Sequence, residues 1–179
     1  MSRKAAAGIR LLVLDVDGVL TDGRLYFGPQ GEALKLFHVR DGHGIRQLDQ
    51  AGIEVAVISG RRSKMVDLRC HELGVSHVYQ GVDDKISAFQ RLCSRLDIEA
   101  SACACVGDDV LDVPLMRTVA LAFAVADAHP EARRAADIVT TLPGGCGAVR
   151  EVCDYLLAGR RGKAQERNKA HEKKKARDR

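Results

Sequence analysis

The sequence has no long apolar segment and no export signal that we can recognise. Its 179 residues include no tryptophan and only four prolines, and no apolar run approaches the roughly 18–20 residues that a membrane-spanning helix requires. The first ten residues, MSRKAAAGIR, lack the apolar core of a secretory signal peptide. These absences argue against a membrane protein and against export, and we expect the chain to be cytoplasmic.

Paired cysteines of the CxxC type are absent as well. Without such a pair a zinc site is not expected, and without an export signal reduced thiols are favoured over disulfides. The six cysteines are Cys70, Cys93, Cys103, Cys105, Cys146 and Cys153.

An excess of basic charge is absent outside the C-terminal segment. Residues 160–179 hold ten Lys or Arg and three acidic residues, a net charge of +7. Residues 1–159 therefore carry a net charge of −3, although the whole chain carries +4. We expect one folded domain over residues 1–159 and a basic, disordered tail over residues 160–179. The alternative for the tail is a nucleic-acid-binding arm, and a solvated terminus is favoured over it.

Short apolar segments alternate with amphipathic ones along the chain. Strands that alternate with helices indicate an α/β fold with a doubly wound parallel sheet and right-handed crossovers. The predicted strands are 9–14, 55–59, 77–79, 102–106, 120–125 and 138–140. The predicted helices are 44–51, 63–73, 84–96, 110–116, 131–136 and 148–157.

The segment 25–39 interrupts this alternation. Residues 25–27 and 33–39 have the pattern of two strands around the turn GPQGE, which predicts a β-hairpin. Only 41 residues separate Asp17 from Ser59, and these are too few for a separate cap domain beside the predicted helix 44–51. A site at the end of the first strand would therefore lie open in a monomer.

The string LLVLDVDGVLTDG at 11–23 is the most informative part of the sequence. Its branched apolar start predicts a strand buried on both faces, followed by Asp15 and Asp17 at the strand end, where α/β proteins place their ligand crevices. Paired carboxylates there suit a hard cation such as Mg²⁺, and one of them can act as a nucleophile. The alternative is an ordinary Asp- and Gly-rich turn.

Three further strings place polar side chains at strand or helix ends. Ser59, in VISGRR, can donate a hydrogen bond to a phosphoryl oxygen, and Lys85 can neutralise phosphate at a helix start. Asp108 follows an apolar strand and can hold Mg²⁺ together with Asp15. Each has a simpler alternative: a turn for Ser59, a solvated lysine, and helix N-caps for the neighbouring acids Asp109 and Asp112.

The order DVDG, ISG, K, GDDxxD resembles the four motifs of the haloacid dehalogenase-like phosphatases, over about residues 9–158. Within them the chain is most similar to the capless 3-deoxy-D-manno-octulosonate 8-phosphate phosphatase family. Strings that support this resemblance are VRDGHGI at 39–45, SGRR at 59–62, RCHELGV at 69–75, YQGVDDK at 79–85, VADAHP at 125–130 and GAVREVCD at 147–154.

The resemblance implies a role for each motif residue. Asp15 would be the nucleophile that forms an aspartyl-phosphate, and Asp17 the general acid and base. Ser59 and Lys85 would hold the phosphoryl group. Mg²⁺ would be bound by Asp15, Asp108 and the backbone carbonyl of Asp17, with Asp109 and Asp112 in support. The implied substrate-binding residues are Asp17, His38, Val39, Arg40, Asp41, Gly42, Arg46, Arg61, Arg69 and Lys85.

The family also implies a homotetramer in which the hairpin and C-terminal segment of a neighbouring subunit cover each site. One position departs from the family pattern, because Cys146 replaces the arginine of the string GGRGAVRE. If that arginine contacts the sugar across the subunit boundary, the cysteine weakens or alters the contact. The alternative is an exposed loop thiol without a role.

The expected activity is Mg²⁺-dependent hydrolysis of 3-deoxy-D-manno-octulosonate 8-phosphate, a step in lipopolysaccharide biosynthesis. The first alternative is a nine-carbon sialic acid 9-phosphate as substrate. Arg61 favours the eight-carbon substrate, since relatives of the sialic type are expected to have an acidic residue there. The second alternative is a non-catalytic assembly or RNA-binding module. Four retained polar side chains in one crevice argue against it, because burying them has a cost.

Overall fold

The computed structural model describes residues 6–177, with side chains as far as Gly162. A six-stranded parallel sheet has the order β5-β4-β1-β6-β7-β8. Its strands are β1 (Leu11–Leu14), β4 (Glu54–Ser59), β5 (His77–Gln80), β6 (Cys103–Gly107), β7 (Leu121–Ala124) and β8 (Ile138–Val139). All residues of β1, β6 and β7 are buried, as expected for strands that helices cover on both faces. The predicted doubly wound α/β fold is confirmed.

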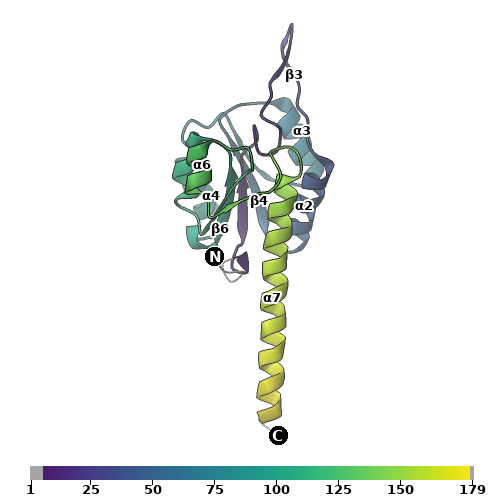
Figure 1. Ribbon diagram of the computed structural model, residues 1–179, viewed down its shortest axis with the longest axis vertical. Helices are drawn as coiled ribbons and strands as arrows, with labels where there is room; N and C mark the ends of the chain where they lie inside the picture. Colours follow the sequence, from purple (N-terminus) through teal and green to yellow (C-terminus); the bar gives the residue numbers. More distant parts are fainter. Residues whose placement is uncertain (1–5, 178–179) are drawn as a thin grey trace.

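Helices cover both faces of this sheet (Figure 1). One group consists of α2 (Val39–Gln50), α3 (Lys64–Leu73) and α7 (Ala148–Arg177), and the other of α4 (Lys85–Leu96), α5 (Val113–Met116) and α6 (Pro130–Ala135). Two 3₁₀ turns flank β6: η1 (Ala100–Ala102) connects α4 to it, and η2 (Val110–Asp112) connects it to α5. None of the helices within the described residues is long and apolar enough to cross a membrane.

The hairpin forms a small sheet of its own. Strands β2 (Tyr26–Gly28) and β3 (Gly31–Leu34) pair antiparallel, and Figure 1 shows them projecting beyond the carboxyl edge of the main sheet. The second strand is shorter than predicted, because the chain leaves the hairpin after Leu34.

Helix α2 begins at Val39, whereas the sequence predicted a start at Gly44. Two glycines in its first turns lowered the predicted helicity, since glycine is a weak helix former. Their positions explain why the helix forms nevertheless. A Cβ atom on Gly42 would collide with the Arg69 guanidinium, and one on Gly44 would lie 3.0 Å from Cβ of Cys153. The glycines therefore allow α2 to pack closely against α3 and α7.

Helix α7 continues through the basic segment to Arg177, where the sequence analysis expected a disordered tail (Figure 1). Lys, Arg, Glu, Gln and Ala dominate this segment, and these are good helix formers. The packed body also extends past the boundary expected at 159. Arg160 donates hydrogen bonds to the carbonyl oxygens of Ala51, Gly52 and Ile9, the last two at 3.1 and 3.3 Å. These bonds tie α7 to the end of α2.

Candidate active site

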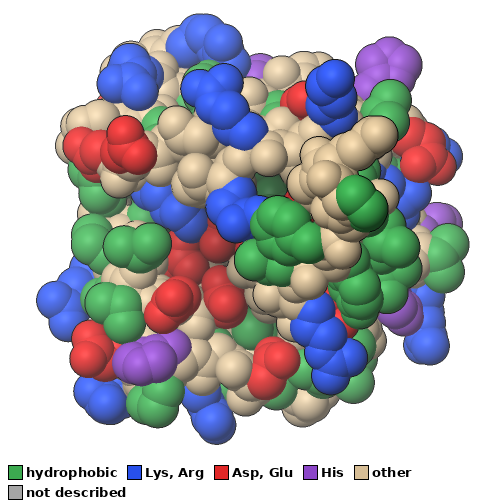
Figure 2. All heavy atoms as spheres, turned by 90° about the horizontal axis from the view of Figure 1, so that it is seen from above, with side chains coloured by type: hydrophobic (Ala, Val, Ile, Leu, Met, Phe, Trp, Pro, Cys, Tyr) green, Lys and Arg blue, Asp and Glu red, His purple; other side chains and the backbone are tan. Residues whose placement is uncertain are grey.

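The candidate site lies at the carboxyl ends of β1, β4 and β6, where the connections of the sheet diverge. From β1 the chain proceeds to β4 on one side, whereas β6 lies on the other side, and such a switch point creates a crevice. A cavity of about 240 Å³ opens there. Figure 2 shows acidic side chains gathered in this hollow, with Lys and Arg side chains on its rim. Its lining residues are Asp15, Asp17, Ser59, Gly60, Arg61, Val82, Asp83, Lys85, Asp108, Asp109, Leu111 and Asp112.

Lys85 forms ion pairs with two carboxylates, that of Asp15 after β1 and that of Asp112 in η2. Its ammonium lies 3.0 Å from Oδ1 of Asp15 and donates a 2.6 Å hydrogen bond to Oδ1 of Asp112. Both Lys85 and Asp112 are buried, and Asp84 caps the helix that positions Lys85. A buried ammonium held between two carboxylates is fixed in position, so it can face a phosphoryl group without reorganising.

Asp112 orients the loop after β6. Its Oδ2 accepts hydrogen bonds from the backbone N–H groups of Asp108 and Asp109, at 3.0 and 3.2 Å. Asp109 in turn caps η2 through a 2.7 Å bond from the N–H of Val110. The helix-cap interpretation of Asp109 and Asp112 is therefore confirmed. The same hydrogen bonds fix the loop that carries Asp108 into the cavity.

Asp108 carries a carboxylate oxygen that the described residues leave unsatisfied. Its Oδ1 is buried without a hydrogen-bond partner, and a Cβ atom on Gly18 would collide with its other oxygen. One carboxylate oxygen from each of Asp15, Asp108 and Asp112 lies within 4.8 Å of the others. Since Lys85 and backbone N–H groups already occupy both oxygens of Asp112, Asp15 and Asp108 remain as donors for a hard cation.

Burial and mutual repulsion make these carboxylates reluctant to ionise. Desolvation, followed by repulsion from Asp112, raises the pKa of Asp15 to about 6, against the opposing effect of Lys85. Desolvation and then repulsion from Asp15 raise the pKa of Asp108 to about 8. A bound cation would offset both effects, so the donor set fits Mg²⁺.

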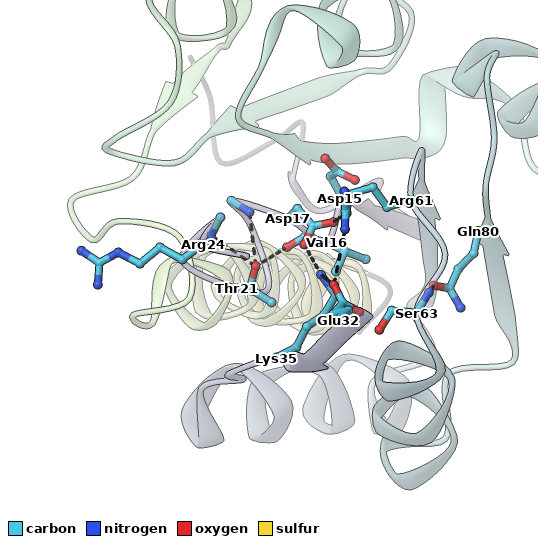
Figure 3. Close-up of polar contacts among 12 residues, drawn as sticks. Asp15, Val16, Asp17, Thr21, Arg24, Glu32, Lys35, Arg61, Ser63 and Gln80 are labelled. Atoms are coloured by element: carbon cyan, nitrogen blue, oxygen red, sulfur yellow. Dashed lines mark hydrogen bonds and ion pairs between the residues drawn. The ribbon is translucent and has the colours of Figure 1, made fainter. Parts of the chain in front are cut away.

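Asp17 faces the hairpin and not the cluster around Asp108. Lys35 donates a short hydrogen bond to its Oδ1, and Nε of Arg61 lies 3.6 Å from its Oδ2 (Figure 3). Glu32 joins the same group, with Oε1 at 3.1 Å from the Lys35 ammonium and at 3.6 Å from the Arg61 guanidinium. The sequence pattern does not predict the inward position of Glu32 and Lys35, because an alternating hairpin strand gives no sign of which charged residues point inward.

Ser59 ends β4 beside this group and is buried. Its carbonyl accepts a 3.1 Å hydrogen bond from the N–H of Val82, which holds the β4 and β5 ends together. The structure thus brings together every catalytic and metal-binding candidate of the sequence analysis, and Arg61 with them.

The remaining substrate-binding candidates do not line this cavity: His38, Val39, Arg40, Asp41, Gly42, Arg46 and Arg69. Asp41 is buried and accepts a 2.7 Å hydrogen bond from the N–H of Arg150, near the start of α7. Arg46 donates to the carbonyl of Glu72, and Arg69 forms an ion pair with the Glu72 side chain at 2.8 Å. Asp41 and Arg46 thus connect α2 to α7 and to α3, whereas the Arg69 ion pair lies within α3.

The loop that carries Cys146 rests on the turn after β1. A Cβ atom on Gly144 would collide with the carbonyl of Gly18, and the N–H of Gly145 donates a 3.0 Å bond to the carbonyl of Val19. Cys146 itself is exposed. The glycines therefore allow two backbones to approach closely beside the site.

Comparison with known proteins agrees with this geometry. Residues 76–147 match a family model described as haloacid dehalogenase-like hydrolase. The 3-deoxy-D-manno-octulosonate 8-phosphate phosphatase KdsC of Escherichia coli K12 is 55% identical over 152 residues, which cover 85% of this chain and 81% of that protein. The chain belongs to the 3-deoxy-D-manno-octulosonate 8-phosphate phosphatase family.

Solved structures of this family superpose closely. The Yersinia pestis 3-deoxy-D-manno-octulosonate 8-phosphate phosphatase has a TM-score of 0.87 at 50% identity, covering 88% of this chain and 85% of that one. The Moraxella catarrhalis phosphatase also has a TM-score of 0.87, at 43% identity over 89% and 91% of the two chains. That crystal structure contains a magnesium ion, a phosphate ion and a KDO molecule.

Proposed function

We propose that this protein is a Mg²⁺-dependent phosphatase that hydrolyses 3-deoxy-D-manno-octulosonate 8-phosphate to the free sugar acid and phosphate. The observation that carries the proposal is the pairing of Asp15 with Lys85 beside the unsatisfied carboxylate of Asp108. This arrangement combines a nucleophile, a fixed ammonium and a cation-binding group in one cavity. We infer the identity of the substrate from the names of its similar relatives.

The positions of Asp15 and Asp17 in the cavity support a reaction in two steps. A carboxylate oxygen of Asp15 attacks phosphorus, the bond from phosphorus to the sugar oxygen breaks, and Asp17 donates a proton to the leaving alkoxide. Water then attacks the aspartyl-phosphate and gives its proton to Asp17, so that phosphate leaves and both carboxylates return to their starting states.

Lys85 and Ser59 serve the phosphoryl group in both steps. The ammonium of Lys85 offsets negative charge on Asp15 and on the phosphoryl oxygens, and the hydroxyl of Ser59 donates a hydrogen bond. A bound Mg²⁺ supplies further positive charge to the same oxygens. It would be held by Asp15, Asp108 and the carbonyl of Asp17.

Arg61 is the residue we assign to the carboxylate of the sugar acid. Its side chain is 44% exposed at the cavity rim, so it can turn from Asp17 and Glu32 to a ligand. A guanidinium can form two parallel hydrogen bonds to a carboxylate. The carboxylate is the group that distinguishes a sugar acid phosphate from a neutral sugar phosphate. The other candidates of the family pattern, from His38 to Gly42 with Arg46 and Arg69, would contact substrate only in an assembly.

We also propose a homotetramer that works in the cytoplasm. Large apolar side chains of the hairpin segment are exposed, with Phe27 at 64% and Leu36 at 56%. A patch of this kind on a soluble chain commonly marks an interface. Packing of the hairpins of neighbouring subunits would cover the patch and close the open side of each site.

The test is phosphate release by the purified full chain. We expect release from the eight-carbon sugar acid phosphate with Mg²⁺ and its loss with EDTA. Asp15→Asn is expected to lower kcat by about 10³-fold or more, since the amide is no nucleophile. The substitution removes a half-buried carboxylate and leaves Lys85 paired with Asp112, so the variant should fold. Wild-type activity in a folded Asp15→Asn protein would overturn the mechanism.

A further inference from the structure

Lys35 is a buried cation that none of the phosphatase motifs accounts for. It follows β3, yet its side chain is only 2% exposed and points back toward the candidate site (Figure 3). Lysine is rarely buried to this extent unless it is paired with anions. Its partners are two carboxylates, Asp17 through a short hydrogen bond and Glu32 at 3.1 Å.

These contacts fix the carboxylate of Asp17 from both sides. Lys35 holds Oδ1, while Arg61 lies near Oδ2 at the longer distance of 3.6 Å. The two cations differ in their freedom to move, because the Arg61 side chain is 44% exposed and the Lys35 side chain is 2% exposed. When Arg61 turns toward a ligand, Lys35 is therefore the contact that keeps Asp17 in place.

We propose that Lys35 is a positioning residue for Asp17, and that the hairpin delivers it to the site of its own chain. This inference rests on the proposed function, in which Asp17 transfers a proton to and from the reacting groups. Proton transfer needs the carboxylate within hydrogen-bond reach of the leaving oxygen, and a displacement of about 1 Å can cost roughly a hundredfold in rate. The hairpin thus does within one chain part of what a cap domain does elsewhere.

Glu32 completes the arrangement from the hairpin side. Its Oε1 lies between the Lys35 ammonium and the Arg61 guanidinium, at 3.1 and 3.6 Å. Desolvation opposes its ionisation, but Lys35 and Arg61, together with the Ser63 hydroxyl, hold the pKa of Glu32 below its usual value. Glu32 therefore remains an anion that anchors Lys35, and its loss should loosen Asp17 to a smaller degree.

The competing explanation is that Lys35 binds the substrate carboxylate directly. The observed burial argues against it, because a ligand could reach the ammonium only after displacing Asp17 or Glu32. The two explanations differ in the substrates that they affect. A misplaced Asp17 slows every ester whose leaving alkoxide needs a proton. A lost carboxylate contact slows only the sugar acid.

The experiment compares Lys35→Met with the wild type on three phosphate esters in the presence of Mg²⁺. The quantity compared is kcat/KM, because it reports the steps up to transfer of the phosphoryl group to Asp15. The esters are the eight-carbon sugar acid phosphate, a neutral hexose 6-phosphate and p-nitrophenyl phosphate, whose leaving group departs without a proton. We expect losses of about 10- to 100-fold with both sugar phosphates, mainly in kcat, and less than about threefold with p-nitrophenyl phosphate. Lys35→Arg should restore part of the loss.

Arg24→Met is the matched control, since this cation of the same segment is exposed and points away from the site (Figure 3). It should leave all three values unchanged. If Lys35→Met does not fold, Glu32→Gln should show the same pattern with smaller losses. Equal losses on all three esters would indicate a purely structural role, and a loss confined to the sugar acid would indicate substrate binding. Either result overturns the positioning role. An inactive wild type would instead overturn the proposed function itself.

Discussion

At the scale of single residues, the site holds three carboxylates close together, and among the described residues Lys85 pairs with only two of them, Asp15 and Asp112. Asp108 has a buried oxygen without a partner, and repulsion from Asp15 adds to its desolvation. Such an arrangement costs folding free energy in the absence of a cation and favours binding of one. The chemistry of the site and the stability of the protein are therefore linked through the same two carboxylates.

The first prediction concerns stability against pH without metal. The pKa of Asp108 is raised to about 8 in the fold, so its ionisation disfavours the folded state. The contribution of Asp108 to stability is fully present below about pH 4 and is lost as pH rises through about 8. In EDTA, the Tm of the wild type relative to Asp108→Asn should therefore fall by several degrees between pH 5.5 and 8.5. Mg²⁺ should reduce this fall.

Differential scanning fluorimetry at several pH values checks this prediction. Asp49→Asn is the control, because Asp49 is exposed on α2 and does not line the cavity. The account of the cation site would be contradicted if the difference between wild type and Asp108→Asn stayed constant with pH, or if Mg²⁺ raised the Tm of both proteins equally.

A second prediction identifies the group that Arg61 recognises. A charge-assisted contact to a carboxylate contributes about 1.5–3 kcal/mol, or roughly ten- to a hundredfold in kcat/KM. Arg61→Ala should cost that factor with the eight-carbon sugar acid phosphate. The variant should keep most of its activity toward p-nitrophenyl phosphate, which has no carboxylate. Equal losses on both would show that Arg61 serves the phosphoryl group or the fold.

At the scale of elements, α7 is attached to the body at both ends of its first half. Asp41 of α2 accepts a hydrogen bond from the N–H of Arg150, and Arg160 donates to the carbonyl of Ala51 at the end of α2. Gly44 lets α2 and α7 pack closely, because a Cβ atom there would lie 3.0 Å from Cβ of Cys153. The helix pair α2 and α7 is therefore a unit, and the folded body ends beyond Arg160.

The third prediction follows from this attachment. Truncation after Gly162 removes most of the basic segment but keeps Arg160, so Tm and kcat should be close to those of the full chain. Truncation after Gly159 also removes the bonds to Ala51, Gly52 and Ile9, and should cost about 1–3 kcal/mol of unfolding free energy. Urea denaturation of both truncated chains measures the difference. Equal stabilities would show that Arg160 contributes nothing.

At the scale of the whole molecule, a monomer leaves the hairpin's apolar side chains in water. The fourth prediction is that Phe27→Asp lowers the mass measured by light scattering from that of a tetramer to that of smaller species, because a charge replaces an apolar contact at the interface. Activity toward the sugar acid phosphate should fall with it. Arg24→Met, at the exposed base of the hairpin, serves as the control. A wild type that scatters as a monomer would refute the tetramer.

Features that a local sequence pattern determines could be predicted, whereas features that depend on tertiary packing could not. The buried strands were predictable from branched apolar runs, and Asp15, Asp108 and Lys85 follow from their places at strand or helix ends. The contacts of Lys35 and Glu32 were not predictable, because they depend on how the projecting hairpin places these side chains relative to Asp17 and Arg61. The start of α2 was missed for a similar reason, since helix packing and not propensity decides it.

The most direct test of the central claim is the ratio of kcat/KM for two sugar acid phosphates, measured on one preparation with Mg²⁺. We predict that the eight-carbon 3-deoxy-D-manno-octulosonate 8-phosphate is preferred over a nine-carbon sialic acid 9-phosphate by at least about tenfold, in keeping with the contact assigned to Arg61. Phosphate release should cease with EDTA. A preference for the nine-carbon ester, or the same slow hydrolysis of both, would contradict the assignment.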